Sequence, residues 1–89
     1  MKIKENFLLK EVAGKTIVVP VGKATLDFNA IITLNETGAF LFSKLQEKDM
    51  TEEDLVNALT SEYDVSADVA SADIKKFVES IKTAGVTEE

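Results

Sequence analysis

The sequence predicts an α+β fold in which a three-stranded antiparallel sheet is followed by three helices. Up to Leu34 the chain holds short, β-branched apolar runs, which are typical of strands. Beyond Leu34 the apolar residues recur at helical spacing. The links between the predicted strands are short, whereas a parallel connection needs a crossover of about a dozen residues or more. We therefore expect an antiparallel meander over residues 5–34, then helices near 35–46, 52–63 and 67–84.

Three apolar segments predict the strands. Residues 5–12 end before an Ala-Gly-Lys sequence that suits a tight turn. Residues 16–21 give the clearest strand pattern, in which Pro20 lacks an N–H donor and should lie at a strand end or on an edge. Alternation places three side chains of this strand on one face, opposite to Val18: Ile17, Val19 and Val21. We expect a loop over residues 22–29 and the third strand over residues 30–34.

The junction after Leu34 carries the change from strand to helix. The side-chain oxygen of Asn35 can accept hydrogen bonds from the free N–H groups of the first helical turn. Gly38 costs about 1 kcal/mol of helix propensity relative to Ala, and its lack of a side chain would let another backbone approach closely. The pattern by itself is also that of an ordinary β-to-α junction.

Capping residues set the bounds of the other two helices. Thr51 suits the start of the second helix, with Asp54 as a shorter substitute for the Glu or Gln of a capping box. Ser66 suits the start of the third helix, and Gly85 suits its end. We expect residues 86–89 to be a short, frayed tail. The apolar stripes of the two helices predict a large part of the core: Leu55, Val56, Leu59, Tyr63, Ala70, Ile74, Phe77, Val78 and Ile81.

Composition narrows the functional classes. The length predicts one domain over residues 1–89, and 45% hydrophobic with 29% charged residues indicates a globular protein. Because the chain has no His and no Cys, we expect no catalytic triad, no zinc or haem site, and no cofactor. The acidic residues 52–54 lack the loop spacing of a calcium site. The apolar runs are too short to cross a bilayer and no signal peptide is recognisable, so we expect a cytoplasmic protein.

Several segments match the pattern of one family. The most specific is residues 34–39, which read Leu-Asn-Glu-Thr-Gly-Ala. The other matching segments are residues 16–20, 50–55 and 62–65, and the closing helix with Phe77 and Ile81 before Gly85. The resemblance itself extends over nearly the whole chain. In these segments the sequence resembles the pyrroloquinoline quinone biosynthesis protein D-like (PqqD-like) family, also called the RiPP recognition element, where RiPP denotes a ribosomally made, modified peptide.

The resemblance implies a winged-helix-like fold and a protein that is not itself an enzyme. Family members bind the leader segment of a precursor peptide and present it, in the manner of a chaperone, to a modifying enzyme, often a radical SAM protein. The leader adds as a strand to the edge of the third strand and lies beside the third helix. Residues 21–22 after the strand proline and residues 46–49 after the first helix depart from the quinone-pathway pattern, which favours the broad family over that pathway.

The candidate binding residues lie on two segments. The resemblance assigns residues 30–33 to the edge that pairs with the peptide, and neither Lys nor Pro blunts that edge. On the third helix Asp73, Lys76 and Ser80 share a face through i, i+3 and i+4 spacing, and Phe77 lies where core and site meet. A covered third strand and a solvated helix face are the alternative interpretations. The predicted peptide-binding residues are thus Ala30, Ile31, Ile32, Thr33, Asp73, Lys76, Phe77 and Ser80.

Two other functions fit the order of elements. The last two helices follow each other as in a helix-turn-helix, so a DNA-binding winged helix is one of them. The net charge of −6 argues against it, because acidic surfaces repel phosphates. The second helix alone carries four acidic residues: Glu52, Glu53, Asp54 and Glu62. The other function is an interaction or dimerisation module without a peptide substrate. We expect no nucleic-acid or membrane partner, and a monomer or weak dimer.

Overall fold

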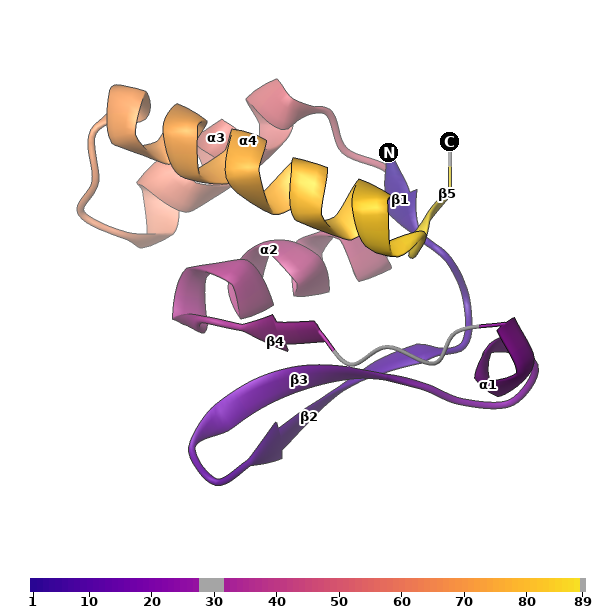
Figure 1. Ribbon diagram of the computed structural model, residues 1–89. Coiled ribbons are helices and arrows are strands. Elements are labelled where there is room, and N and C mark those ends of the chain that lie inside the picture. Colours follow the sequence, from indigo (N-terminus) through magenta and orange to yellow (C-terminus); the bar gives the residue numbers. More distant parts are fainter. Residues whose placement is uncertain (28–31, 89) are drawn as a thin grey trace.

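The chain is arranged as a sheet, one helix packed against it, and a pair of helices beyond (Figure 1). The structure is a computed structural model, and it describes residues 1–27 and 32–88. Figure 1 shows the sheet at the bottom, α2 (Glu36–Glu47) in the middle, and α3 (Glu52–Glu62) with α4 (Ala67–Ala84) at the top. The predicted α+β fold, with a three-stranded antiparallel sheet followed by three helices, is confirmed.

The sheet has three antiparallel strands in the order β2-β3-β4, so β3 is central and the other two are edges. The strands are β2 (Phe7–Val12), β3 (Lys15–Pro20) and β4 (Ile32–Leu34). Phe7 lies opposite Pro20, which is the last residue of β3. The proline therefore ends its strand, as predicted, and removes no hydrogen bond from the middle of the sheet.

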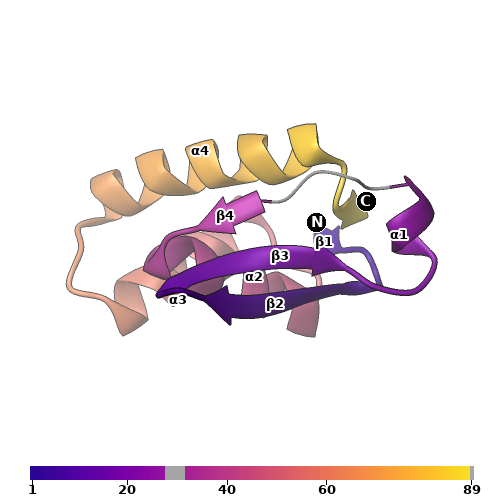
Figure 2. The ribbon, with the colours of Figure 1, turned by 60° about the horizontal axis from the view of Figure 1, so that its bottom comes forward.

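The two faces of this sheet differ in what covers them. Val18 of β3 is fully buried, so its face is the one that packs on the helices. Side chains directly opposite each other in an antiparallel pair share a face. Leu8 lies opposite Val19 and Lys10 opposite Ile17, so these four side chains project from the outer face. Figure 2 looks onto the strands from that side, and none of the described helices crosses in front of β2 and β3.

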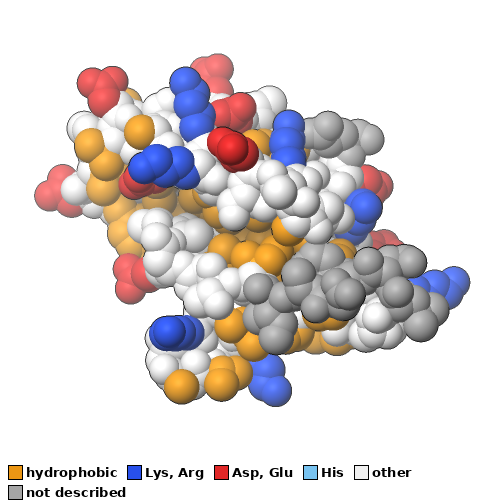
Figure 3. Space-filling view, in the orientation of Figure 1, with side chains coloured by type: hydrophobic (Ala, Val, Ile, Leu, Met, Phe, Trp, Pro, Cys, Tyr) orange, Lys and Arg blue, Asp and Glu red, His pale blue; other side chains and the backbone are white. Residues whose placement is uncertain are grey.

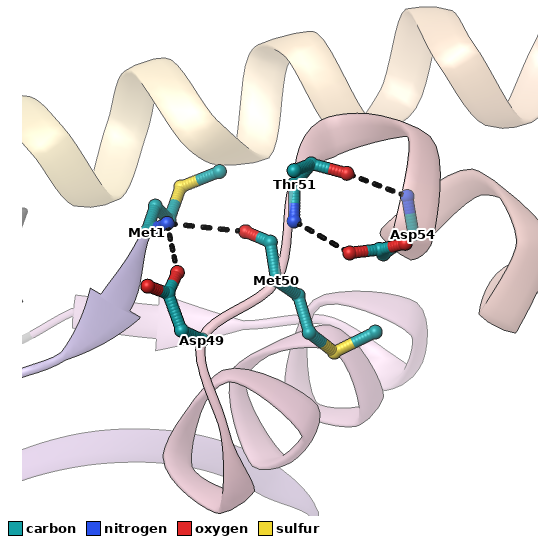
Figure 4. A network of polar contacts seen from close by, with 5 residues as sticks. All are labelled: Met1, Asp49, Met50, Thr51 and Asp54. Carbon is teal, nitrogen blue, oxygen red and sulfur yellow. Dashed lines mark hydrogen bonds and ion pairs between the residues drawn. The ribbon is translucent and has the colours of Figure 1, made fainter.

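The helices begin and end within one residue of their predicted bounds. At the start of α3, the Thr51 hydroxyl accepts from the Asp54 N–H at 3.1 Å, and the Asp54 carboxylate accepts from the Thr51 N–H at 3.0 Å (Figure 4). This capping box lowers the pKa of Asp54, first through the bond from the Thr51 backbone. At the start of α4, the Ser66 hydroxyl accepts from the Val69 N–H at 3.2 Å. None of the described helices is long and apolar enough to span a bilayer.

One hydrophobic core lies between the sheet and the helices. Its fully buried side chains come from β3, all three long helices and the C-terminal segment: Val18, Leu41, Phe42, Leu45, Leu55, Leu59, Ile74, Ile81 and Val86. Val56 and Tyr63, which were predicted in the buried stripe of α3, are half-buried at its margin. The Tyr63 ring meets the Phe40 ring edge-on, with the centroids 5.5 Å apart, and so joins α3 to α2.

The two ends of the described chain pair with each other. β1 (Lys2–Ile3) and β5 (Thr87–Glu88) form a two-stranded antiparallel ribbon, drawn beside the helices in Figure 1. Val86, just before β5, is fully buried. The prediction of a frayed tail is therefore wrong for residues 86–88, because this segment gains both a strand partner and a place in the core.

The turn at Gly85 explains how the chain returns to the core. Gly85 has a φ of +79°, which Gly adopts at little cost. Its N–H donates to the Lys82 carbonyl at 3.1 Å, and the Val86 N–H donates to the Ile81 carbonyl at 3.3 Å. These two bonds form a Schellman C-cap, in which the residue after the glycine packs back on the last helical turn. Ile81 and Val86 are accordingly both fully buried.

The first residue is held by the link between α2 and α3. The amino group of Met1 donates to the Asp49 carboxylate and, at 3.2 Å, to the Met50 carbonyl (Figure 4). The Met50 N–H donates back to the Met1 carbonyl at 2.9 Å. β1 is thereby fixed beside the C-terminal end of α2.

A second departure from prediction lies in residues 22–29, which were expected to be a loop but contain the short helix α1 (Ala24–Asp27).

Candidate binding groove

A groove of about 410 Å³ lies between β4, the first half of α2 and the middle of α4. Two of its walls come from the sheet edge and from α4, and α2 lies between them. In Figure 3 hydrophobic side chains are visible between the charged side chains of α4 above and the strands below. The lining residues are Thr33, Leu34, Asn35, Thr37, Gly38, Leu41, Asp73, Lys76, Phe77 and Ser80.

The N-terminal turn of α2 shapes the groove at the strand-to-helix junction. The Asn35 side-chain oxygen accepts from the Gly38 N–H at 2.7 Å, which confirms the predicted cap. A Cβ at Gly38 would lie 3.0 Å from that oxygen and 3.5 Å from the Leu34 side chain. The glycine was expected to admit another backbone. Instead it admits the cap oxygen and Leu34, so the junction can fold tightly beside the groove.

Four residues of α4 form one wall of the groove. Asp73, Lys76 and Ser80 are exposed, and helical spacing puts them in a row facing the same opening. Phe77 is only 8% exposed, so most of its ring belongs to the core while its remaining surface lines the groove. Among the described residues, neither Asp73 nor Lys76 forms an ion pair. Both charges are therefore available to a ligand.

The opposite wall is the edge strand β4. Thr33 is exposed, while Ile32 and Leu34 are half-buried and pack against the core. β4 pairs with β3 on one side, and within residues 1–27 and 32–88 no strand pairs with its other side. An edge of this kind presents backbone N–H and C=O groups that an added strand can use.

The structure brings together most of the residues that were predicted from the sequence to bind peptide. Thr33, Asp73, Lys76, Phe77 and Ser80 all line the groove. Ile32 belongs to the same edge strand, but its side chain packs toward the core and does not line the groove. Ala30 and Ile31 lie outside the described residues. The assignment of these residues to peptide binding stays a prediction.

The sequence did not predict that the strand-to-helix junction and the first half of α2 line the groove. Five lining residues had been given only local roles, or none: Leu34 and Asn35 at the junction, and Thr37, Gly38 and Leu41 in α2. Gly38 gave no such signal, because the close approach that it permits is made by the Asn35 oxygen and the Leu34 side chain. A second hollow, of about 480 Å³, shares residues 33–35 and continues toward the β2–β3 turn, so the concave surface extends past the groove itself.

Within the described residues, no group of three or more His, Cys, Asp or Glu side chains is placed to hold a metal ion. The groove combines three features: the backbone edge of β4, an apolar floor and the opposite charges of Asp73 and Lys76. These features can bind an extended chain: the edge offers main-chain partners, the floor receives apolar side chains, and the charges set polarity.

Known proteins share the fold of this chain and its sequence pattern. Among solved structures, one described as TbiB1 in complex with the TbiA(beta) leader peptide is similar, with a TM-score of 0.71 at 19% sequence identity. The similarity covers 99% of this chain and 95% of that chain, so the fold is shared throughout. No curated protein gives a significant match. The family model for Coenzyme PQQ synthesis protein D (PqqD) matches residues 9–86, and this chain therefore belongs to the PqqD family.

Proposed function

We propose that this protein binds the leader segment of a ribosomally made precursor peptide and presents it to a peptide-modifying enzyme. The observation that carries the proposal is that an open strand edge and an apolar-floored groove lie side by side. Family membership and the similarity to a protein that was solved with a leader peptide support it. In this proposal residues 1–89 act as one recognition domain without catalytic activity, and a radical SAM protein is the expected enzyme.

The main chain of β4 supplies the first part of the binding energy. In an antiparallel pair every second residue directs both its N–H and its C=O toward the neighbouring strand. The three residues Ile32–Leu34 can thus form about two to four hydrogen bonds with an added strand. Each contributes about 0.5–1.5 kcal/mol net. This part of the binding is independent of leader sequence, so it can give affinity and little specificity.

The side chains of the groove supply the specificity. Alternate side chains of an added strand point into the groove, where Leu34 and Phe77 offer apolar surface. Asp73 and Lys76 lie at the groove mouth with opposite charge. A leader that carries a basic and an acidic residue at matching positions is favoured, and one with the charges exchanged is disfavoured.

The distribution of charge does not favour DNA binding. The first three residues of α3 are acidic, and α4 carries acidic residues among its lysines. A recognition helix needs neighbouring surfaces that attract phosphates, and these surfaces repel them. A dimerisation module also has an available edge in β4, but pairing two copies there leaves the charged wall of α4 without a stated role. The peptide proposal uses both walls.

The test is calorimetric titration with the leader of the precursor peptide encoded beside this gene. A series of leader peptides, each N-methylated at one amide, should weaken binding at every second position, because only alternate amides of an added strand face β4. Lys76→Ala should weaken binding by about 2- to 5-fold, as expected for an exposed ion pair. Lys75→Ala is the matched control, since Lys75 is an exposed lysine of the same helix that does not line the groove.

Two results would contradict the proposal. Equal sensitivity to N-methylation at consecutive positions excludes strand addition, because alternation is a geometric property of a strand. Equal effects of the Lys76 and Lys75 substitutions remove the groove from the binding site and leave only a general response to charge.

A further inference from the structure

The proposed leader binding leaves the outer face of the sheet unused. The side chains that β2 and β3 project from it, called the outer sheet face, are Leu8, Lys10, Val12, Lys15, Ile17 and Val19, and Thr33 of β4, opposite Ile17, borders them on the groove side. The register places them together: Leu8 lies opposite Val19, Lys10 opposite Ile17 and Val12 opposite Lys15. Diagonal neighbours across a pair are also within reach of each other, so Val12 adjoins Ile17 and the apolar residues form one patch.

This face is apolar where a solvated sheet face is normally polar. Leu8 is 54% exposed and Val12 is 45% exposed, and both are large hydrophobic side chains. Central β3 reads Ile17-Val18-Val19, an uninterrupted apolar run of the kind found in strands that are buried on both faces. Only the Val18 side is covered by described helices (Figure 2). The sequence of β3 thus fits a strand whose second face is also covered by a partner.

The charges on this face indicate the chemistry of that partner. Lys10 and Lys15 are the charged side chains of the outer sheet face, and none of its six residues is acidic. The chain as a whole has a net charge of −6, so a local basic character here runs against its average. The complementary surface is an apolar patch bounded by carboxylates.

A second copy of this chain fits the face poorly. Two outer sheet faces packed together would bring the lysines of both copies into one interface, where like charges repel. Two six-residue strands cover roughly 200 Å², since a strand rises about 3.3 Å per residue and neighbouring strands lie about 4.8 Å apart. A stable interface buries about 800 Å² per partner, whereas smaller contacts are typical of transient encounters.

We propose that the outer sheet face docks the peptide-modifying enzyme, through an apolar patch on that enzyme that is bounded by acidic residues. This inference rests on the proposed function, which requires a second surface for the enzyme. None of the six residues lines the groove, and among them only Lys15 lines the second hollow that adjoins it, so the greater part of the outer sheet face lies apart from the leader site. A contact of this size suits a carrier that delivers its peptide and then dissociates.

The experiment measures the dissociation constant between this protein and the purified modifying enzyme from the same gene cluster. The double variant Leu8→Ser with Val12→Ser should weaken enzyme binding by about 10-fold or more, since both apolar anchors are removed. Lys10→Glu should also weaken enzyme binding. This loss of affinity should grow as the salt concentration is lowered, because the introduced charge then repels the acidic rim of the enzyme patch more strongly. Both variants should bind leader within about 2-fold of wild type and keep the wild-type circular dichroism spectrum.

Matched controls lie elsewhere on the surface. Val69 is 52% exposed on α4, so Val69→Ser removes an equally exposed apolar side chain outside the sheet. Lys75→Glu reverses a lysine charge on the same helix. Both should leave enzyme binding unchanged. Groove variants such as Lys76→Ala should impair leader binding alone, so failure of the groove proposal and failure of the docking proposal give different results.

Three outcomes overturn the docking proposal. The first is wild-type affinity of the Leu8 and Val12 double variant for the enzyme. The second is a wild-type dimer in sedimentation equilibrium that the same double variant dissociates, which assigns the face to self-association. The third is binding to vesicles of mixed neutral and anionic lipid that the Lys10 variant abolishes, which assigns it to a membrane surface.

Discussion

Phe77 contributes to both the core and the groove, so its replacement by Ala should lower the free energy of unfolding. The ring is 8% exposed, so Phe77→Ala loses nearly the full burial of an aromatic side chain. Such substitutions cost about 3–5 kcal/mol. One side of the ring faces the open groove, where neighbours and water can partly fill the space, so we expect a value near 3 kcal/mol. At this chain length each kcal/mol shifts Tm by about 4–8 °C, which gives a loss of about 12–24 °C.

This cost is a large share of the total stability. A chain of 89 residues has a free energy of unfolding of about 4–13 kcal/mol. Urea denaturation followed by circular dichroism measures the change, and Thr51→Ala is the reference, because loss of its cap should cost about 1 kcal/mol. Equal denaturation midpoints for the two variants would mean that the Phe77 ring is not part of the core.

Three further predictions concern the caps and the C-terminal segment. The pKa of Asp54 is lowered below 3.8 in the folded state, so its contribution to stability is full above that pH and is lost as pH falls through the folded pKa. Acid titrations should show this loss in the wild type and lack it in Asp54→Asn; identical curves would contradict it. Val86→Ala empties a fully buried position and should cost about 2 kcal/mol in urea denaturation, whereas a frayed segment would lose nothing. Gly38→Ala should fail to give the stabilisation of about 1 kcal/mol that is usual within a helix, because the new Cβ lies 3.0 Å from the Asn35 oxygen; a full gain would show that the cap can move aside.

Local chemistry explains which parts of the fold could be predicted from the sequence. The caps at Asn35, Thr51 and Ser66 act within three residues, so a short stretch of sequence contains both partners of each bond. Gly85 was likewise recognisable as a C-cap from its position after an apolar stripe. Helix bounds followed from these residues almost to the residue, because cap and periodicity agree.

The ribbon between the ends could not be predicted in the same way. Ile3 lies opposite Thr87, and each strand of the ribbon is two residues long. Two residues carry no alternation, and partners so far apart in sequence share no local signal. The sequence also could not show that the side chains of Ile17 and Val19 point outward. A strand that is apolar on both faces does not indicate which face is inside.

The candidate groove was predictable on its helical wall and in part on its strand. Spacing alone put Asp73, Lys76 and Ser80 on one face of α4, and the structure places that face on the groove. The contribution of α2 required the tertiary arrangement, since Thr37 and Leu41 reach the groove only because α2 lies between β4 and α4.

An NMR titration of the labelled protein with its leader shows whether the peptide adds as a strand to β4 beside α4. We expect amide shifts on Ile32–Leu34 and on the groove face of α4 around Lys76, with nuclear Overhauser contacts between leader backbone protons and β4. Shifts confined to α3, or no shifts at high peptide concentration, would exclude strand addition at β4.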